Sequence, residues 1–141
     1  MKNKVFKEFS SQNDLNLFNK YFKFSEFDSP DQKGSGEKFM NREFLIKLAR
    51  ARQIANAAFG IRSGYRTQEY NKLLLQRGYK AAPDSAHLRG LAVDIAVVST
   101  QHRFIIINAL IAVGFTRIGI GNTFIHVDLD MDKPQNTMWT Y

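Results

Sequence analysis

Cysteine is absent from the 141-residue chain. Its absence excludes disulfide bonds, thiolate metal ligands and cysteine nucleophiles, so any bound metal must rely on nitrogen and oxygen ligands. The chain also lacks an apolar run of about 18 residues, so we expect no membrane span. The opening stretch MKNKVFKEFSSQNDL is basic but has no apolar segment of the kind found in secretory signals. We therefore expect a protein that is cytoplasmic as synthesised and reaches other compartments only when another process releases it.

Histidine is scarce, and basic residues outnumber acidic ones. The histidines are His87, His102 and His126, and 20 Lys and Arg against 13 Asp and Glu give a formal net charge of +7. Such a charge attracts nucleic acid or an anionic polymer such as cell wall, although an ordinary solvated surface can also carry it. The basic residues are scattered and no nucleic-acid motif is present, so we expect no nucleic-acid partner.

The patterning predicts one α+β domain over residues 1–141, with an antiparallel sheet packed with helices. Hydrophobic residues make up 44% of the chain, which is enough for one core. Three helices are predicted after the capping residues Asn41, Thr67 and Thr100, ending near residues 59, 76 and 113. The predicted strands are 61–65, 91–98, 117–120 and 124–129. Residues 1–23 are too aromatic for a disordered tail, so we expect an extension that packs on the domain. We expect the protein to be a monomer.

Two polar residues, Asp94 and His126, interrupt predicted apolar strands. A buried carboxylate or imidazole in such a position needs a polar partner. Strand alternation places His126 and Asp128 on one face, so neighbouring strands could bring His87, Asp94 and His126 together. Two imidazoles and a carboxylate suit a catalytic zinc ion and leave one position open for water. Each histidine could instead be an ordinary core residue, and we expect His102, at the start of a helix, to lie at the surface.

Several motifs in the same order give the sequence a family resemblance. They are FSEFDSPD (24–31), SGYRTQEYN (63–71), SAHLRGLAVDI (85–95), GFTRIGIGNTFIHVDLD (114–130) and the late Trp139. In these motifs the chain resembles the zinc D-Ala-D-Ala carboxypeptidases and dipeptidases, and it is most similar to their short branch in phage and bacterial cell-wall hydrolases. The SxHxxGxAxD segment followed by HxD is the most specific part of the resemblance.

The resemblance implies roles for individual residues. His87, Asp94 and His126 match the ligands of Zn²⁺, and Arg66 matches a catalytic and substrate-binding arginine that steadies the oxyanion. Ser85 matches a serine of the substrate pocket. The implied activity is zinc-assisted hydrolysis of D-amino-acid-containing peptide bonds in peptidoglycan stems or cross-links. Arg66 could otherwise be a salt-bridged surface residue and Ser85 a simple turn residue.

One position departs from the family pattern. Better-known members carry an acid three residues before the last histidine as the general base, and this chain has Thr123 there. Asp128 is our candidate for the catalytic base because it shares a strand face with His126, but it could equally hold a ligating imidazole in place. Glu69 is a weaker candidate.

The departure at Thr123 also leaves the activity open to alternatives. A catalytically inactive zinc-binding module that binds cell wall or a protein partner is the main one, and a basic nucleic-acid binder is a remoter one. The sequence does not distinguish carboxypeptidase from endopeptidase action.

Overall fold

The computed structural model describes residues 8–79 and 81–141. Five strands form one sheet in the order β1-β2-β4-β3-β5, and all neighbours are antiparallel except β3 and β5. The strands are β1 (Ile61–Ser63), β2 (Ala92–Ala96), β3 (Arg117–Ile120), β4 (Phe124–Asp128) and β5 (Thr137–Thr140). The expected α+β fold with a largely antiparallel sheet is confirmed. The parallel edge strand β5 was not predicted, because its short run TMWT has no distinctive pattern.

Helices make up most of the remaining regular structure. The α-helices are α1 (Gln12–Tyr21), α2 (Ser35–Phe39), α3 (Arg42–Ala55), α4 (Gln68–Gln76) and α5 (Thr100–Ala112), and the 3-10 helices are η1 (Phe24–Phe27) and η2 (Ala86–Arg89). Asn41 and Thr67 cap α3 and α4 through their side chains, as predicted. The cap of α5 is Ser99 rather than Thr100, because the Ser99 hydroxyl accepts the backbone N–H of His102. No helix in the described part of the chain is long and apolar enough to cross a membrane.

The N-terminal extension packs on the rest of the molecule over its described part. Helix α1 lies against α3, and Phe18 is fully buried among other aromatic rings. Residues 1–7 of the predicted extension lie outside the described residues. Burial of aromatic rings thus holds the described part of the extension on the domain, as its composition indicated.

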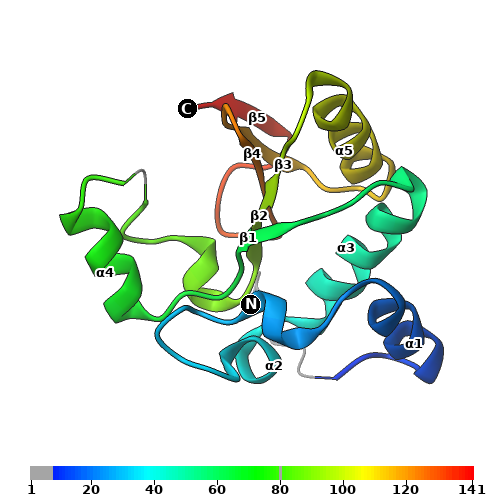
Figure 1. Ribbon diagram of the computed structural model, residues 1–141, viewed down its shortest axis with the longest axis horizontal. Coiled ribbons are helices and arrows are strands. Elements are labelled where there is room, and N and C mark those ends of the chain that lie inside the picture. Colours follow the sequence, from blue (N-terminus) through cyan, green and yellow to red (C-terminus); the bar gives the residue numbers. More distant parts are fainter. Residues whose placement is uncertain (1–7, 80) are drawn as a thin grey trace.

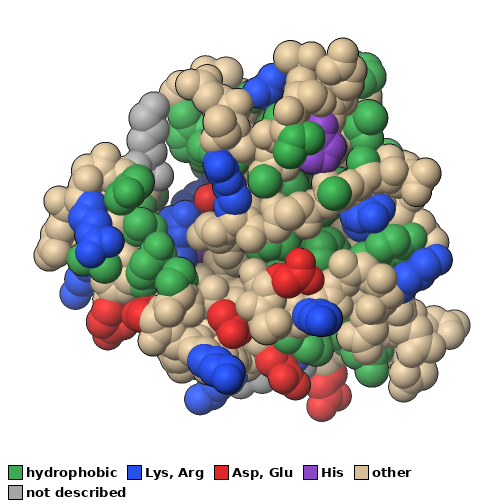
Figure 2. All heavy atoms as spheres, in the orientation of Figure 1, with side chains coloured by type: hydrophobic (Ala, Val, Ile, Leu, Met, Phe, Trp, Pro, Cys, Tyr) green, Lys and Arg blue, Asp and Glu red, His purple; other side chains and the backbone are tan. Residues whose placement is uncertain are grey.

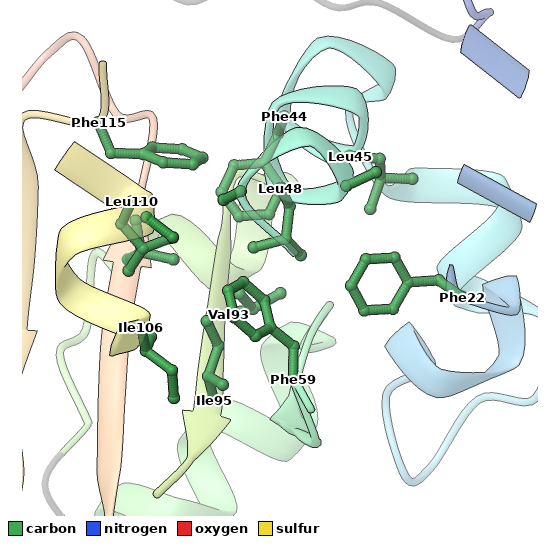
Figure 3. Close-up of a cluster of buried hydrophobic side chains, with 14 of the residues drawn as sticks. Phe22, Phe44, Leu45, Leu48, Phe59, Val93, Ile95, Ile106, Leu110 and Phe115 are labelled. Atoms are coloured by element: carbon green, nitrogen blue, oxygen red, sulfur yellow. The ribbon is translucent and has the colours of Figure 1, made fainter. Parts of the chain in front are cut away.

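The sheet separates a dry face from a polar one. Helices α3 and α5 pack on the dry face, whereas α4 lies away from them on the other side of the sheet (Figure 1). Val93 and Ile95 of β2 point toward Leu48, Ile106 and Leu110 (Figure 3). The alternate residues of β2 and β4 therefore point to the polar face, where the candidate site lies.

Candidate metal centre

One row of residues crosses the whole sheet on its polar face. Asp94 lies opposite His126, His126 opposite Gly119, and Gly119 opposite Trp139, with Ser63 of β1 beside Asp94. A Cβ atom at position 119 would lie 2.7 Å from Nε1 of Trp139, so only glycine leaves room for the indole. The Trp139 ring thus lies over β3 and comes within 5.7 Å of the His126 ring, centroid to centroid.

His87 comes to this row from η2. The hydroxyl of Ser85 accepts the backbone N–H of His87, and Gly90 ends the turn with a φ of +68°. The carbonyl of Gly64 lies 2.7 Å from Nδ1 of His87. Because a carbonyl can only accept, Nδ1 carries the proton, and Nε2 presents a lone pair. This Nε2 atom is buried, lies 3.3 Å from Oδ1 of Asp94, and makes no hydrogen bond of acceptable geometry with the described residues.

His126 is oriented in a similar way by a second carboxylate. Its Nε2 lies 2.7 Å from Oδ2 of Asp128, and its Nδ1 lies 3.0 Å from Oδ1 of Asp94. When Nε2 donates its proton to Asp128, the lone pair of Nδ1 faces the Asp94 carboxylate. Two imidazole lone pairs and a carboxylate oxygen then converge, with all three atoms within 4.8 Å of one another. Such a set of acceptors requires a proton or a cation between them, and its composition fits zinc.

Electrostatics within the cluster agree with this arrangement. Burial lowers the pKa of His87, which keeps its imidazole neutral and available as a ligand. Burial would raise the pKa of Asp94, but the neighbouring His87 and His126 hold it below its usual value. Burial opposes the charged form of His126, yet hydrogen bonds to Asp128 and Asp94 raise its pKa. The cluster thus favours a positive charge between Asp94 and Asp128.

Asp128 is engaged on both of its oxygens. Its Oδ2 accepts from His126, and its Oδ1 accepts from Nε of Arg117 at 2.7 Å and from the backbone N–H of Asp130 at 3.1 Å. Burial would raise the pKa of Asp128, but the hydrogen bond from His126 and the charges of His126 and Arg117 lower it. These are the contacts of a carboxylate that fixes an imidazole, which is one of the two roles predicted for Asp128.

Arg66 is buried beside the cluster rather than exposed at the surface. One terminal nitrogen donates to Oδ2 of Asp94 at 3.2 Å, Nε donates to Ser63 at 3.0 Å, and the other terminal nitrogen donates to Asn71 at 3.4 Å. A guanidinium has five N–H groups, so two are left over from these three bonds. Arg66 therefore both holds Asp94 and lines the cleft described below.

The other candidate residues occupy different positions. Ser85 lines the cleft and also caps the turn of His87. Thr123 is exposed, and its hydroxyl binds Arg62 at 2.6 Å. Glu69 is exposed in the first turn of α4 and does not line the cleft. The ring of His102 bonds the Ala58 carbonyl and the Val98 amide, away from the cluster.

A cleft of about 540 Å³ opens over the cluster. Figure 2 shows a hollow between the α4 side of the molecule and the sheet, where basic and acidic side chains lie together. Besides the residues predicted from the sequence, its walls contain Ala81, Ala82, Ala86, Arg117, Phe124, Lys133, Trp139 and Tyr141. Sequence reasoning gave none of these a site role. Arg117 had a usable signal, because it alternates with Ile118 and Ile120 on a strand as Asp94 does with its neighbours.

Comparison with known protein families identifies the family to which the chain belongs. Residues 20–128 match the family model described as Peptidase M15, and the chain belongs to the peptidase M15 family. This confirms the family resemblance of the motifs and supports peptidase activity with a metal site at His87, Asp94 and His126. A search of curated proteins gave no match.

Proposed function

We propose that the protein is a zinc-dependent peptidase that hydrolyses D-amino-acid-containing peptide bonds of peptidoglycan stems or cross-links. The observation that carries the proposal is the convergence of Nε2 of His87, Oδ1 of Asp94 and Nδ1 of His126 beneath a cleft. A cluster with one carboxylate and two neutral imidazoles leaves a coordination position for water or substrate, as catalytic zinc sites do. Membership in the peptidase M15 family supports the peptide as the substrate class.

His87, Asp94 and His126 would hold the zinc ion. When bound there, zinc supplies Lewis acidity, which polarises the scissile carbonyl and acidifies water. Arg66 keeps Asp94 in place through the carboxylate oxygen that faces away from the histidines. Its remaining N–H groups can orient a substrate oxygen and stabilise the negative charge that develops on it.

Asp128 has two proposed roles that the contacts support unequally. Its hydrogen bonds to His126 and Arg117 favour a positioning role. Asp128 is also the one acidic residue of the described cleft lining that is not a proposed ligand, and each carboxylate oxygen can accept more than one hydrogen bond. It therefore stays our candidate for the general base, and the Asp128→Asn variant discussed below separates the two roles.

The cell wall is the proposed place of action. A net charge of +7 favours contact with an anionic polymer. The protein, which we take to be a monomer, would reach the wall after release from the cell that makes it, for example by phage-mediated lysis or as part of a virion.

The decisive experiment is digestion of purified peptidoglycan with products identified by mass spectrometry. We expect released or shortened peptides with the zinc-loaded protein, none after chelation, and recovery on adding zinc. Stem peptides shortened by one residue would indicate carboxypeptidase action, and separated cross-links would indicate endopeptidase action. The His87→Ala/His126→Ala variant, purified in parallel, controls for contaminating hydrolases. A protein that binds zinc but releases nothing from any wall preparation would contradict the peptidase proposal and favour a binding module.

A further inference from the structure

Arg117 is a buried cation on the strand next to His126. It is 9% exposed and lies on β3, two residues before Gly119, which pairs with His126. Its Nε donates to Oδ1 of Asp128 at 2.7 Å, and one terminal nitrogen donates to the carbonyl of Pro134 at 2.6 Å. The guanidinium carbon lies 5.0 Å from the centre of the Trp139 ring. Three independent contacts therefore fix this side chain.

Asp128 needs such a partner. Its side chain is 2% exposed, and a carboxylate removed from water is costly unless it is paired with a charge and hydrogen-bonded. The backbone N–H of Asp130 supplies one hydrogen bond, and Arg117 supplies a permanent positive charge. With Oδ1 held in this way, Oδ2 is directed at Nε2 of His126.

We propose that Arg117 is a positioning residue of the metal centre: it acts through Asp128 to orient His126 so that Nδ1 faces Asp94 and His87. The inference rests on the proposed zinc site. It adds to that site a residue that contacts Asp128, the hydrogen-bond partner of the proposed ligand His126. Arginine suits the position because one planar group binds Asp128 and Pro134 together and stacks on Trp139. Lysine could replace only part of this set.

The test compares Arg117→Gln, Arg117→Lys and Asp128→Asn with the unchanged protein. Zinc affinity is measured by competition with a fluorescent chelator, and the visible spectrum of the cobalt-substituted protein reports the geometry around the metal. We expect Arg117→Gln to weaken zinc binding by about 10- to 100-fold and to change the cobalt spectrum, because losses behind a metal ligand are typically of this size. Arg117→Lys should recover part of the affinity. Arg62→Gln, at an exposed arginine that contacts Thr123, is the matched control and should bind zinc normally.

A double variant shows whether Arg117 works through Asp128. If it does, Arg117→Gln combined with Asp128→Asn should lose little more affinity than Asp128→Asn alone, whereas independent roles would give multiplied losses. Undiminished zinc affinity in folded Arg117→Gln, or multiplied losses in the double variant, would overturn the inference. Should Arg117→Gln fail to fold, Arg117→Lys and its combination with Asp128→Asn give the same comparison. If the unchanged protein binds no zinc, both the proposed function and this inference are wrong. If the unchanged protein binds zinc and the Arg117 variants bind it equally well, the inference alone is wrong.

Discussion

The two faces of β2 and β4 are built from alternate residues of the same ten, yet they follow opposite rules. On one face Val93, Ile95, Ile125 and Val127 are fully buried against helices. On the other, Asp94 and His126 lie opposite each other, with Asp128 next to them on β4. The dry face needs only apolar residues that fill space, whereas the polar face must give each buried charge a specific partner.

This difference separates the stability of the fold from the chemistry of the site. Apolar burial on the dry face contributes about 25 cal/mol per Å² and does not depend on a particular partner atom. The polar face contributes no comparable stability, because the free energy of removing its charges from water is about as large as the attraction between them. Substitutions on the dry face should therefore lower stability and spare metal binding. Substitutions on the polar face should lower metal binding, and those that leave a buried charge unpaired should lower stability as well.

The largest effect is expected from His87→Ala combined with His126→Ala. Removing two of three proposed ligands leaves Asp94 unable to hold zinc alone, so zinc content should fall from about one per chain to background and peptide hydrolysis should disappear. Metal analysis and activity on peptidoglycan measure this directly. His102→Ala is the matched control, since that ring bonds Ala58 and Val98 away from the cluster, and it should keep both properties. Full zinc occupancy in the double variant would end the assignment of the site.

Ile125, which precedes His126 on β4, provides the opposite case. Ile125→Ala should lower the free energy of unfolding by about 2–5 kcal/mol, because it removes buried methyl groups and leaves a cavity. Zinc content, measured at low temperature where the variant is folded, should stay near one per chain. Denaturant unfolding provides the stability, with Ile125→Val as a control that should lose only about 0.5–1.5 kcal/mol. A variant that is as stable as the parent but has lost zinc would break the comparison between the faces.

The same contrast explains what the sequence could predict. Strand alternation in FIHVD and AVDIA was enough to assign each residue to a face of its strand. Asp94 and His126 meet because β2 and β4 are neighbours in the sheet, which alternation alone does not predict. His87 required the family motif, because η2 and its Gly64 contact have no periodic signal. The strand β5 and the position of Trp139 in the cleft wall could not be predicted, because the parallel pairing of β5 with β3 is a long-range contact.

The Asp128→Asn variant distinguishes a positioning role of Asp128 from a role as the general base. As the partner of His126, its loss should weaken zinc affinity by about 10- to 100-fold, and added zinc should restore activity. As the base, its loss should lower the rate by about 10²–10⁴-fold with zinc still bound. The hydrogen bonds to His126 and Arg117 lead us to expect the first result. Titrating zinc into assays of the variant distinguishes the two, and unchanged activity without added zinc would contradict both.

Arg66→Lys tests the guanidinium that bonds Asp94, and the effect expected on activity is smaller. Lysine keeps the charge but cannot bond Ser63, Asn71 and Asp94 at once. We expect turnover to fall about tenfold, equivalent to one charge-assisted hydrogen bond of roughly 1.5 kcal/mol, with little change in the midpoint of thermal unfolding. Steady-state kinetics and a melting curve give the two values. Near-normal turnover would show that Arg66 is not a clamp for substrate or oxyanion.

The smallest effect is expected at Asp31, a carboxylate that resembles Asp128 in its hydrogen bonding but lies at the surface. Its oxygens accept from the hydroxyls of Ser29 and Thr67, each at 2.6 Å, and these two bonds lower the pKa of Asp31 below its ordinary value. A carboxylate with a lowered folded pKa stabilises the fold above its unfolded pKa of about 3.9, and this contribution is lost as pH falls through the folded value. The metal-free protein should therefore be slightly more stable than Asp31→Asn at pH 6, and the difference should shrink in acid below about pH 3.9. Thermal unfolding of both proteins across this range measures the difference, in which the titration of all other groups cancels. A difference that is independent of pH would show that the two hydroxyls do not favour the ionised form of Asp31.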